Sequence, residues 1–416
     1  MAEGNGILAA RPSRLRVAPG LLHGRLTPPP SKSCAHRALI CAALAGRDMS
    51  GRESVIRGLG EPSDDILVTQ ACLFALLDGD GTLDCGESGT TLRLLVPVAA
   101  ALGRPVTFTG RGRLPQRPLK EYEEAFRGHG TTLRFAGEAS LPVSLRGRLA
   151  PGRFELPGHV SSQYVSGLLL ALPLLAGDSD IVLTSALQSA PYVDLTREIM
   201  ARFGVEAEPL PPDPDRHPFG GFHVPGGQRY RPADYHVETD YSQAAFWLAA
   251  NYLGSAVELP GLPERTSQGD RAIVGLLGRL AAMDREPDHR LEIDASQIPD
   301  LVPILAVAAA FTPGTTRIVN AARLRLKESD RLASVADSLT AIGADIRVTG
   351  DGLEIRGETV LRGGETDSRN DHRIAMAMAI AATRTQTGVV IRDPWCVDKS
   401  YPRFFDDLLT VGGVVT

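Results

Sequence analysis

Two basic side chains stand at the start of an apolar segment near the N-terminus, at a spacing that suits ligand binding. Lys32 and Arg37 lie roughly one helical turn apart, with Ser33 between them. Both side chains can face one ligand, and the free N–H groups of a helix start attract anions. The set could therefore bind a phosphate or a carboxylate. A capping serine with two solvated charges explains the same residues equally well.

Other polar residues of the first half also stand where apolar helices are expected to begin. The glycines between Gly86 and Thr90 permit close backbone approach to a ligand, although a plain tight turn is the better single interpretation. Short polar side chains at a buried helix start need partners, which a ligand or the backbone could supply equally. The further candidates of this half are Gly89, Arg117, Ser161, Ser162, Gln163 and Ser189.

A carboxylate opens an apolar helix in the second half. Asp300 follows Ile298 and Pro299, and an ionised side chain there is costly unless it has partners or a chemical task. Stabilisation of the helix start explains this residue equally well when it is taken alone. Glu328 is a second carboxylate, in a dense polar run that a solvated helix start would also explain. The basic candidates of this half are Lys327, Arg331, Arg373 and Lys399.

Together these candidates predict a positively charged site in a chain whose net charge is −5. Such a site suits small substrates that carry several negative charges, with Asp300 and Glu328 left for proton transfer. The sequence contains no Walker glycine loop, nucleophile elbow or metal-ligand spacing. We therefore predict chemistry by proton transfer and charge stabilisation, with no metal and no cofactor.

Lysine is scarce in this chain, and its scarcity indicates which basic residues matter. Of the 44 basic residues only four are lysine, namely Lys32, Lys120, Lys327 and Lys399. Arginine serves wherever a charge only needs to be solvated, so a remaining lysine marks a place that needs a compact ammonium group. Chance survival of individual lysines is the alternative.

Composition restricts the class of protein. The 416 residues contain 43% hydrophobic and 22% charged side chains, which is typical of a globular protein of two domains. The acidic balance argues against a nucleic-acid binder, because no basic excess is available to neutralise phosphates. No segment has the length of a signal-peptide core or a membrane span, so we expect a cytoplasmic monomer that contacts no membrane. The cysteines are expected to remain reduced thiols: Cys34, Cys41, Cys72, Cys85 and Cys396.

A repeated plan positions these residues. Six segments share a polar start, an apolar helical run that should be buried, and a glycine near its end. They begin near Ser33, Ser88, Ser161, Tyr241, Ser296 and Asp371, and the glycines are Gly46, Gly103, Gly177, Gly254, Gly314 and Gly388. A strand and a second helix follow, the latter near Asp64, Pro118, Tyr192, Gly269, Ser329 and Tyr401. Several units close with two more strands, so the predicted unit is βαβαββ.

The spacing sorts the six units into two sets of three. The first helices recur from 33 to 241, from 88 to 296 and from 161 to 371, which are offsets of 208, 208 and 210 residues. Second helices recur from 118 to 329 and from 192 to 401, offsets of 211 and 209. An internal duplication therefore predicts a discontinuous domain of residues 1–29 and 240–416 around an inserted domain of residues 30–239. We expect the substrate cleft between them.

The motifs that contain these candidates resemble one enzyme family, in order from near Arg14 to the C-terminus. The segments are PSKSCAHRAL, GESGTTLR, SSQYVSGLL, DYSQAAF, IPDLVPILA, RLRLKESDRL, NDHRIAMAMA and KSYPRFF. They are similar to those of the 3-phosphoshikimate 1-carboxyvinyltransferases, also called EPSP synthases. The resemblance implies an α/β fold of two inside-out domains, each of three βαβαββ units with buried helices.

The resemblance also implies transfer of the enolpyruvyl group of phosphoenolpyruvate to the 5-hydroxyl of shikimate 3-phosphate, through a tetrahedral intermediate that loses phosphate. Asp300 would accept the hydroxyl proton, Glu328 would handle the methylene proton, and Lys32 would assist charge at the bridging oxygen. Shikimate 3-phosphate would be held by Lys32, Ser33, Arg37, Ser161, Ser162, Gln163, Ser189, Asp300 and Lys327. Phosphoenolpyruvate, and glyphosate in its place, would be held by Lys32, Gly89, Arg117, Gln163, Arg331, Arg373 and Lys399.

The sequence departs from common family patterns in places, and two rival functions stay open. The departures are Glu87 with Ser88, Ala190, Thr239 and Arg323, which alter single polar contacts and no proton-transfer residue. The sister enzymes that use UDP-N-acetylglucosamine typically carry a loop cysteine near the position of Arg117, where this chain has none. A non-catalytic binder of anionic metabolites would gain nothing from Asp300 and Glu328.

Overall fold

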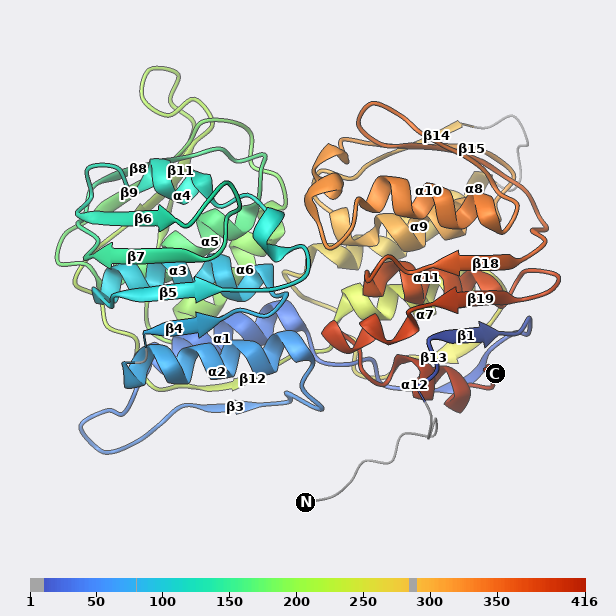
Figure 1. The fold of residues 1–416 in the computed structure, drawn as a ribbon, viewed down its shortest axis with the longest axis horizontal. Coiled ribbons are helices and arrows are strands. Elements are labelled where there is room, and N and C mark those ends of the chain that lie inside the picture. The colour runs from blue at the N-terminus through green and yellow to red at the C-terminus, as the bar shows by residue number, and fades with distance from the viewer. Residues whose placement is uncertain (1–10, 80, 284–289) are drawn as a thin grey trace. The chain divides into compact units, whose positions relative to one another are not determined.

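The computed structural model describes residues 11–79, 81–283 and 290–416, and the chain divides into two compact units (Figure 1). The inserted unit runs from Pro30 to Glu238. The terminal unit combines the N-terminal segment up to Pro29 with Thr239–Thr416. The chain therefore passes from one unit to the other only at residues 29–30 and 238–239.

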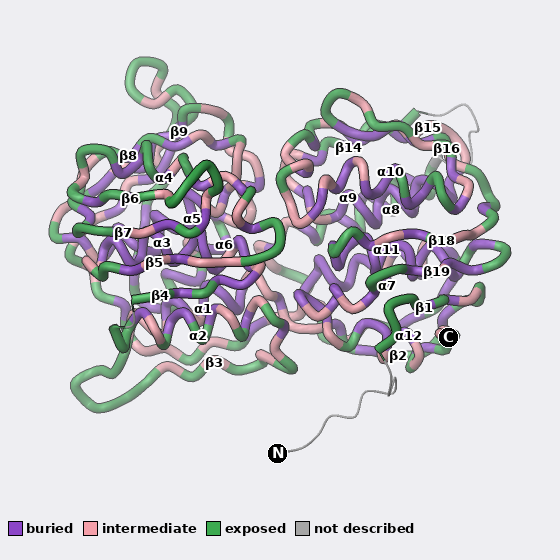
Figure 2. The backbone as a smooth tube through the Cα atoms, in the orientation of Figure 1, coloured by how far each residue is buried: buried purple, intermediate pink, exposed green. Residues whose placement is uncertain are grey.

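Three buried helices form the interior of the inserted unit. They are α1 (Lys32–Ala45), α3 (Gly89–Leu102) and α5 (Ser162–Ala171). Each is preceded by a serine whose side chain accepts a backbone N–H of the first turn, which satisfies one of the free donors at the helix start. The second helices are α2 (Asp64–Asp78), the short α4 (Lys120–Ala125) and α6 (Ala190–Arg202). Figure 2 shows burial concentrated along the first set.

A glycine allows two of these helices to approach closely. A Cβ atom added to Gly167 in α5 would lie 2.4 Å from the carbonyl oxygen of Arg93 in α3 and 2.9 Å from Pro97 Cγ. No side chain larger than hydrogen fits there unless the helices separate. The starts of α3 and α5, which carry candidate site residues, are therefore held in a fixed relation.

Three sheets surround the helices of the inserted unit. The first has the order β4-β5-β7-β6, with β4 (Thr82–Asp84), β5 (Val106–Thr109), β6 (Thr131–Phe135) and β7 (Val143–Gly147). The second has the order β10-β11-β9-β8, with β8 (Arg153–Leu156), β9 (Ser179–Leu183), β10 (Glu208–Leu210) and β11 (Gly221–Val224). The third pairs β3 (Val55–Arg57) with β12 (Asp234–His236) in parallel.

The terminal unit repeats this plan. Its buried helices are α7 (Tyr241–Tyr252), α9 (Val302–Ala310) and α11 (His372–Ala382), and its second helices are α8 (Ile273–Met283), α10 (Arg331–Ala341) and α12 (Phe404–Thr410). One sheet has the order β14-β15-β17-β16, with β14 (Arg290–Asp294), β15 (Gly314–Val319), β16 (Asp345–Val348) and β17 (Leu353–Gly357). The others are β1-β19-β18 (Arg14–Val17, Val389–Arg392, Gly364–Asp367) and the parallel pair β2 (His23–Arg25) with β13 (Ala256–Glu258).

The strand directions demonstrate the internal duplication. β4 is parallel to β5 and β5 is antiparallel to β7, as β14 is parallel to β15 and β15 is antiparallel to β17. Each unit also contains one parallel two-stranded pair. Among the described residues, three sheets have the four strands of a complete βαβαββ unit, and the other three are smaller.

Two details differ from the sequence prediction. The helix expected near Ser296 begins at Val302, after the 3₁₀ helix η4 (Pro299–Leu301), because proline disfavours helical backbone in the residue before it. Gly314, expected just past a helix, opens strand β15 in the left-handed region, with φ of 109°. All five cysteines are buried and form no disulfide.

Candidate active site

Asp300 is the centre of a charged cluster in the terminal unit. It lies in η4, directly before α9. Its Oδ1 accepts a hydrogen bond from Arg331 Nη1 at 2.8 Å, and its Oδ2 accepts one from Arg373 Nη2 at 3.1 Å. Lys327 Nζ lies 3.7 Å from Oδ1. Three cations from other segments therefore surround this carboxylate.

Arg331 connects Asp300 to two further carboxylates. Its side chain is only 2% exposed, so its charge needs partners. Nη2 donates to Glu328 Oε2 at 2.7 Å, and Nε donates to Asp371 Oδ2 at 2.8 Å. Asp371 also accepts the Ser329 hydroxyl at 3.0 Å and caps the start of α11. The starts of α9, α10 and α11 are thus joined through one guanidinium group.

The charges of this cluster set its protonation states. Burial alone would raise the pKa of Asp300, but Arg373, Lys327 and Arg331 outweigh it and hold that pKa well below its ordinary value. Burial lowers the pKa of Lys327 to about 8, against the opposing effect of Asp300. Burial would also lower the pKa of Arg331, but Asp371, Glu328 and Asp300 raise it. At neutral pH Asp300 is therefore ionised.

Lys399 belongs to the same end of the terminal unit. It closes the 3₁₀ helix η6 (Pro394–Lys399), and its Nζ donates to the backbone oxygen and to Oδ1 of Asn370, both at 2.7 Å. Asn370 has a left-handed φ of 56° and directly precedes Asp371. The sequence analysis did not single out Asn370, because asparagine before a helix is common and its partner is distant in the chain.

Asp270 is a second carboxylate that the sequence analysis did not select. It lies in the 3₁₀ helix η3 (Gly269–Ala272), is 2% exposed and accepts the Ser242 hydroxyl of α7. Burial and the charge of Asp300 raise its pKa to about 6, while Arg373 opposes the shift. Asp270 has the same sequence feature that identified Asp300, namely a carboxylate at the opening of a helix.

The inserted unit holds its cations differently. Lys32, the first residue of α1, donates to Asp65 Oδ2 of α2 at 2.7 Å. Arg37 is 2% exposed and donates to the Thr196 hydroxyl at 2.6 Å and to the carbonyl oxygens of Tyr192 and Ser33 at 3.1 and 2.8 Å. Lys32 is therefore balanced by a carboxylate, whereas Arg37 is held by neutral oxygen atoms.

Arg117 lies against the start of α3. It follows the 3₁₀ helix η1 (Leu114–Gln116), and a Cβ atom added to Gly89 would lie 2.5 Å from its Nη1. Ser88 caps this helix by accepting the N–H of Thr91 at 3.2 Å. The absent side chain of Gly89 thus leaves room for a guanidinium group beside the free N–H groups of a helix start.

The start of α5 places Gln163 between two residues of α3. Gln163 Nε2 donates to the Thr90 hydroxyl at 2.8 Å, and its Oε1 accepts from Arg93 Nη1 at 3.0 Å. Arg93 also donates, at 3.0 Å, to the carbonyl oxygen of Pro118, which is the residue after Arg117. Arg93 is 3% exposed and was not singled out from the sequence, where it follows an apolar leucine inside the helix.

Three serines complete the predicted set. Ser161 caps α5 by accepting the N–H of Gln163 at 3.3 Å, and Ser162 is buried in its first turn. Ser189 precedes α6 with a left-handed φ of 57°, a conformation that costs a non-glycine residue about 1–3 kcal/mol. Residues strained in this way are concentrated at active sites and ligand clamps.

The departures from the family patterns have structural partners. Arg323 Nη2 donates to the carbonyl oxygen of Ser296 at 2.7 Å, and the carbonyl oxygen of Thr239 accepts Gln268 Nε2 at 2.9 Å. Ala190 is the first residue of α6. The Glu87 carboxyl group lies beside Gly112, where an added Cβ atom would come within 2.6 Å of it.

The structure thus joins the site residues of each unit separately. In the terminal unit one network of ion pairs links Asp300, Lys327, Glu328, Arg331 and Arg373. Lys399 is bound to Asn370, the residue before Asp371, which pairs with Arg331. In the inserted unit hydrogen bonds or close approach link the remaining candidates to the starts of α1, α3, α5 and α6. The meeting of both sets in one cleft stays a prediction.

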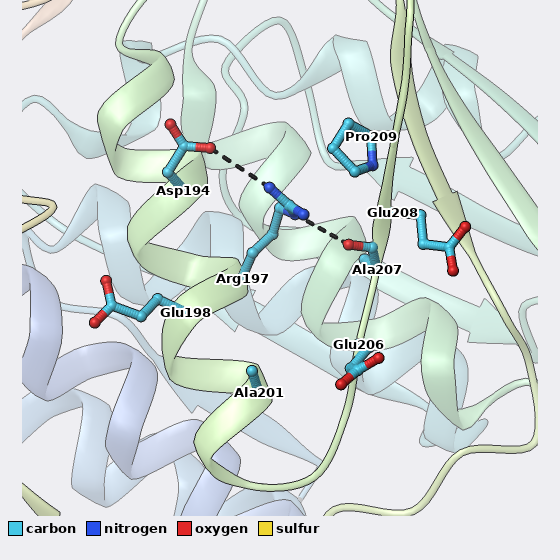
Figure 3. A pocket seen from close by; sticks show the side chains of 8 residues that line it. All are labelled: Asp194, Arg197, Glu198, Ala201, Glu206, Ala207, Glu208 and Pro209. Carbon is cyan, nitrogen blue, oxygen red and sulfur yellow. Dashed lines mark hydrogen bonds and ion pairs between the residues drawn. The ribbon is translucent and has the colours of Figure 1, made fainter.

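A pocket of about 420 Å³ lies elsewhere in the inserted unit, between α6 and β10 (Figure 3). Arg197 points across it, with Nη1 3.7 Å from Asp194 Oδ1 and Nε donating to the carbonyl oxygen of Ala207 at 3.0 Å. The remaining charged lining is acidic, from Glu198, Glu206 and Glu208. It contains none of the predicted site residues and does not suit a phosphate.

No helix in the described part of the chain could span a membrane.

Comparison with known proteins identifies the family. The model of EPSP synthase, 3-phosphoshikimate 1-carboxyvinyltransferase, matches residues 17–408. A 3-phosphoshikimate 1-carboxyvinyltransferase of Clostridium novyi is 41% identical over 96% of this chain and 98% of its own length, and that of Clostridium acetobutylicum is 42% identical with the same coverage. A solved EPSP synthase of Acinetobacter baumannii shares the fold with a TM-score of 0.76, at 24% identity over 97% of this chain and 99% of its own.

The family model covers both units and every candidate site residue, from Lys32 to Lys399. The relatives in Clostridium match almost the whole chain at about two identical residues in five. The chain belongs to the EPSP synthase family.

Proposed function

We propose that this protein transfers the enolpyruvyl group of phosphoenolpyruvate to the 5-hydroxyl of shikimate 3-phosphate, releasing phosphate. The observation that carries the proposal is the match of the whole chain to relatives that bear the name of this activity. The ion-pair network around Asp300 supports it, because the network combines an ionised carboxylate with cations that suit anionic substrates.

The proton transfers are assigned to the two carboxylates of the terminal unit. Asp300 takes the proton of the 5-hydroxyl as that oxygen attacks C2 of phosphoenolpyruvate, while Glu328 enters the reaction in its acid form and gives its proton to C3. The tetrahedral intermediate then loses a proton from the new methyl group to Glu328, and the C–O bond to phosphate breaks. The departing phosphate takes up one proton, and Asp300 returns the hydroxyl proton to solvent, so that the protons balance. Lys32 donates to the bridging oxygen as negative charge develops on it. No electrons are exchanged, so the reaction requires no redox cofactor.

The binding roles follow the same division. Shikimate 3-phosphate is held by Lys32, Ser33, Arg37, Ser161, Ser162, Gln163, Ser189, Asp300 and Lys327. Phosphoenolpyruvate is held by Lys32, Gly89, Arg117, Gln163, Arg331, Arg373 and Lys399. These residues belong to both units, so we propose that the substrates bind in a cleft between the units and that the protein acts as a cytoplasmic monomer.

The local contacts support these roles unequally. Arg117 beside Gly89, and Gln163 between Thr90 and Arg93, are well placed to donate to a carboxylate or a phosphate near the start of α3. Arg331 already donates to Asp300, Glu328 and Asp371, so its larger contribution is to hold both proton-transfer groups in position.

An assay of phosphate release separates this proposal from its rivals. The protein is mixed with phosphoenolpyruvate and either shikimate 3-phosphate or UDP-N-acetylglucosamine. We expect release only with shikimate 3-phosphate, because the loop of residues 110–122 lacks the cysteine typical of the sister enzymes. Release with the nucleotide sugar would indicate the sister reaction, and binding of both substrates without release would indicate a non-catalytic binder.

A further inference from the structure

A chain of buried polar side chains crosses the first three helices of the inserted unit. His36 Nδ1 of α1 lies 2.7 Å from the Thr69 hydroxyl of α2. That hydroxyl lies 2.6 Å from the Thr91 hydroxyl of α3, which in turn lies 2.7 Å from the Ser88 hydroxyl. All four side chains of this hydrogen-bonded series are buried, and none of the four has a role in the proposed reaction. A series of hydrogen-bonded polar groups in an apolar core favours one arrangement of its members.

Thr69 connects this chain to the candidate site. Its hydroxyl is 3.0 Å from the carbonyl oxygen of Asp65, one helical turn earlier. The Asp65 carboxylate accepts a hydrogen bond from Lys32 Nζ at 2.7 Å. At the other end, Ser88 caps α3 and directly precedes Gly89, which lies against Arg117. The hydroxyl of Thr69 therefore connects Asp65, which binds Lys32, with the residues that cap α3 just before Gly89.

The hydrogen atoms of this chain have a preferred arrangement. His36 Nε2 is buried and has no hydrogen-bond partner among the described residues. A proton on Nε2 would leave a buried donor unsatisfied, so the proton belongs on Nδ1, which donates to Thr69. Thr69 then accepts from the imidazole and donates to Asp65 or to Thr91. Its hydroxyl is the one group that serves all three helices.

We propose that Thr69 is a positioning residue, whose hydroxyl locks the first turn of α2, and through Asp65 the ammonium group of Lys32, to the capped start of α3. The proposal rests on the proposed function, because it gives Lys32 and Gly89 their roles there. Thr69 touches no substrate and acts only through these residues. A hydrogen-bond chain of this kind holds its anchored groups closer to one geometry than apolar packing alone does.

The test is Thr69→Val, which keeps the shape of the side chain and removes the hydroxyl. The imidazole N–H and the Thr91 hydroxyl lose their common partner, and Lys32 and Gly89 lose their fixed relation. We expect kcat/KM for phosphoenolpyruvate to fall by about 10- to 100-fold at saturating shikimate 3-phosphate. Thr69→Ser restores the hydroxyl and should recover most of this loss, which a defect of packing would not show.

Thr312→Val is the matched control. Thr312 is buried in the terminal unit. Like that of Thr69, its hydroxyl donates to a carbonyl oxygen four residues earlier, here that of Ala308 at 2.8 Å. It also lies 2.6 Å from the hydroxyl of Tyr252. It should lose similar stability in thermal unfolding and keep wild-type kcat/KM. Equal kcat/KM in Thr69→Val and Thr312→Val, or failure of Thr69→Ser to recover activity, would overturn the positioning role. An inactive wild-type protein would instead overturn the proposed function.

Discussion

Asp300 shows at the scale of one residue how nearby cations keep a buried carboxylate ionised. Alone in an apolar helix start it would be expected to take up a proton. The three cations around it reverse that effect and keep it ionised. The sequence identified the residue by its costly position, but not the identity of its partners, because Arg331 and Arg373 are 31 and 73 residues away in the chain.

The first prediction concerns Asp300→Asn, which keeps the shape of the side chain and removes the base. We expect turnover to fall by about two to four orders of magnitude, with shikimate 3-phosphate still bound. Steady-state rates and calorimetric titration provide the measurements. Asp294→Asn is the control, since Asp294 is an exposed carboxylate six residues earlier at the end of β14. Near wild-type turnover in Asp300→Asn would mean that the proton has another acceptor.

The second prediction follows from the pKa of Lys327, which burial lowers to about 8. The ammonium group is charged below that pH and becomes neutral above it, so shikimate 3-phosphate should lose a cationic partner as pH rises. We expect kcat/KM for shikimate 3-phosphate to decline above about pH 8, and Lys327→Arg to move the decline to higher pH. A decline at the same pH in both proteins would assign it to another group.

The third prediction tests whether lysine persists where its geometry matters. Lys32 and Lys399 each donate at 2.7 Å to a partner in the site, whereas Lys120 is an exposed residue at the start of α4. A planar guanidinium is wider than an ammonium, so Lys32→Arg and Lys399→Arg should lose about 100-fold in activity, because a displacement of about 1 Å can cost that much. Lys120→Arg should be nearly silent. The same activity in all three variants would contradict the argument.

At the scale of elements, the site is a set of helix starts. Capping residues at α3 and α5 could be predicted from the sequence, since serine before an apolar run is a local signal, whereas the cap of α1 is Ser31 and not the predicted Ser33. The start of α9 was displaced by η4, because Pro299 changes the backbone before it. Arg93 and Asn370 could not be recognised, because their partners lie on other elements and one sequence read alone does not pair distant residues. Asp270 had the same sequence feature as Asp300 and was not selected.

The fourth prediction concerns the start of α3. In Gly89→Ala the new methyl group would lie about 2.5 Å from Arg117 Nη1, so the guanidinium must move away from the helix start. We expect the KM for phosphoenolpyruvate to rise and inhibition by glyphosate, to which we expect the wild type to be sensitive, to weaken. Gly275→Ala in α8 is the control, because a Cβ atom there meets nothing within 4 Å. Unchanged inhibition in Gly89→Ala would show that Arg117 does not bind this ligand.

At the scale of the whole molecule, the internal duplication explains why cations recur near helix starts in both units of an acidic chain. One sheet of each unit has the same strand order, β4-β5-β7-β6 and β14-β15-β17-β16, and both units carry cations near the starts of buried helices. The repeat offsets near 208 residues made the duplication predictable from the sequence. The relation between the units was not predictable in this way, since no local pattern specifies it.

The most direct test of the central claim follows one oxygen atom through the reaction. Phosphoenolpyruvate labelled with ¹⁸O in its bridging position is incubated with the protein and shikimate 3-phosphate, and the products are analysed by mass spectrometry. Enolpyruvyl transfer breaks the C–O bond, so the released phosphate should carry the label, and the unlabelled enolpyruvyl ether should form in equal amount. Label found in pyruvate instead, or phosphate formed without shikimate 3-phosphate, would contradict the assignment of this chain as an enolpyruvyl transferase.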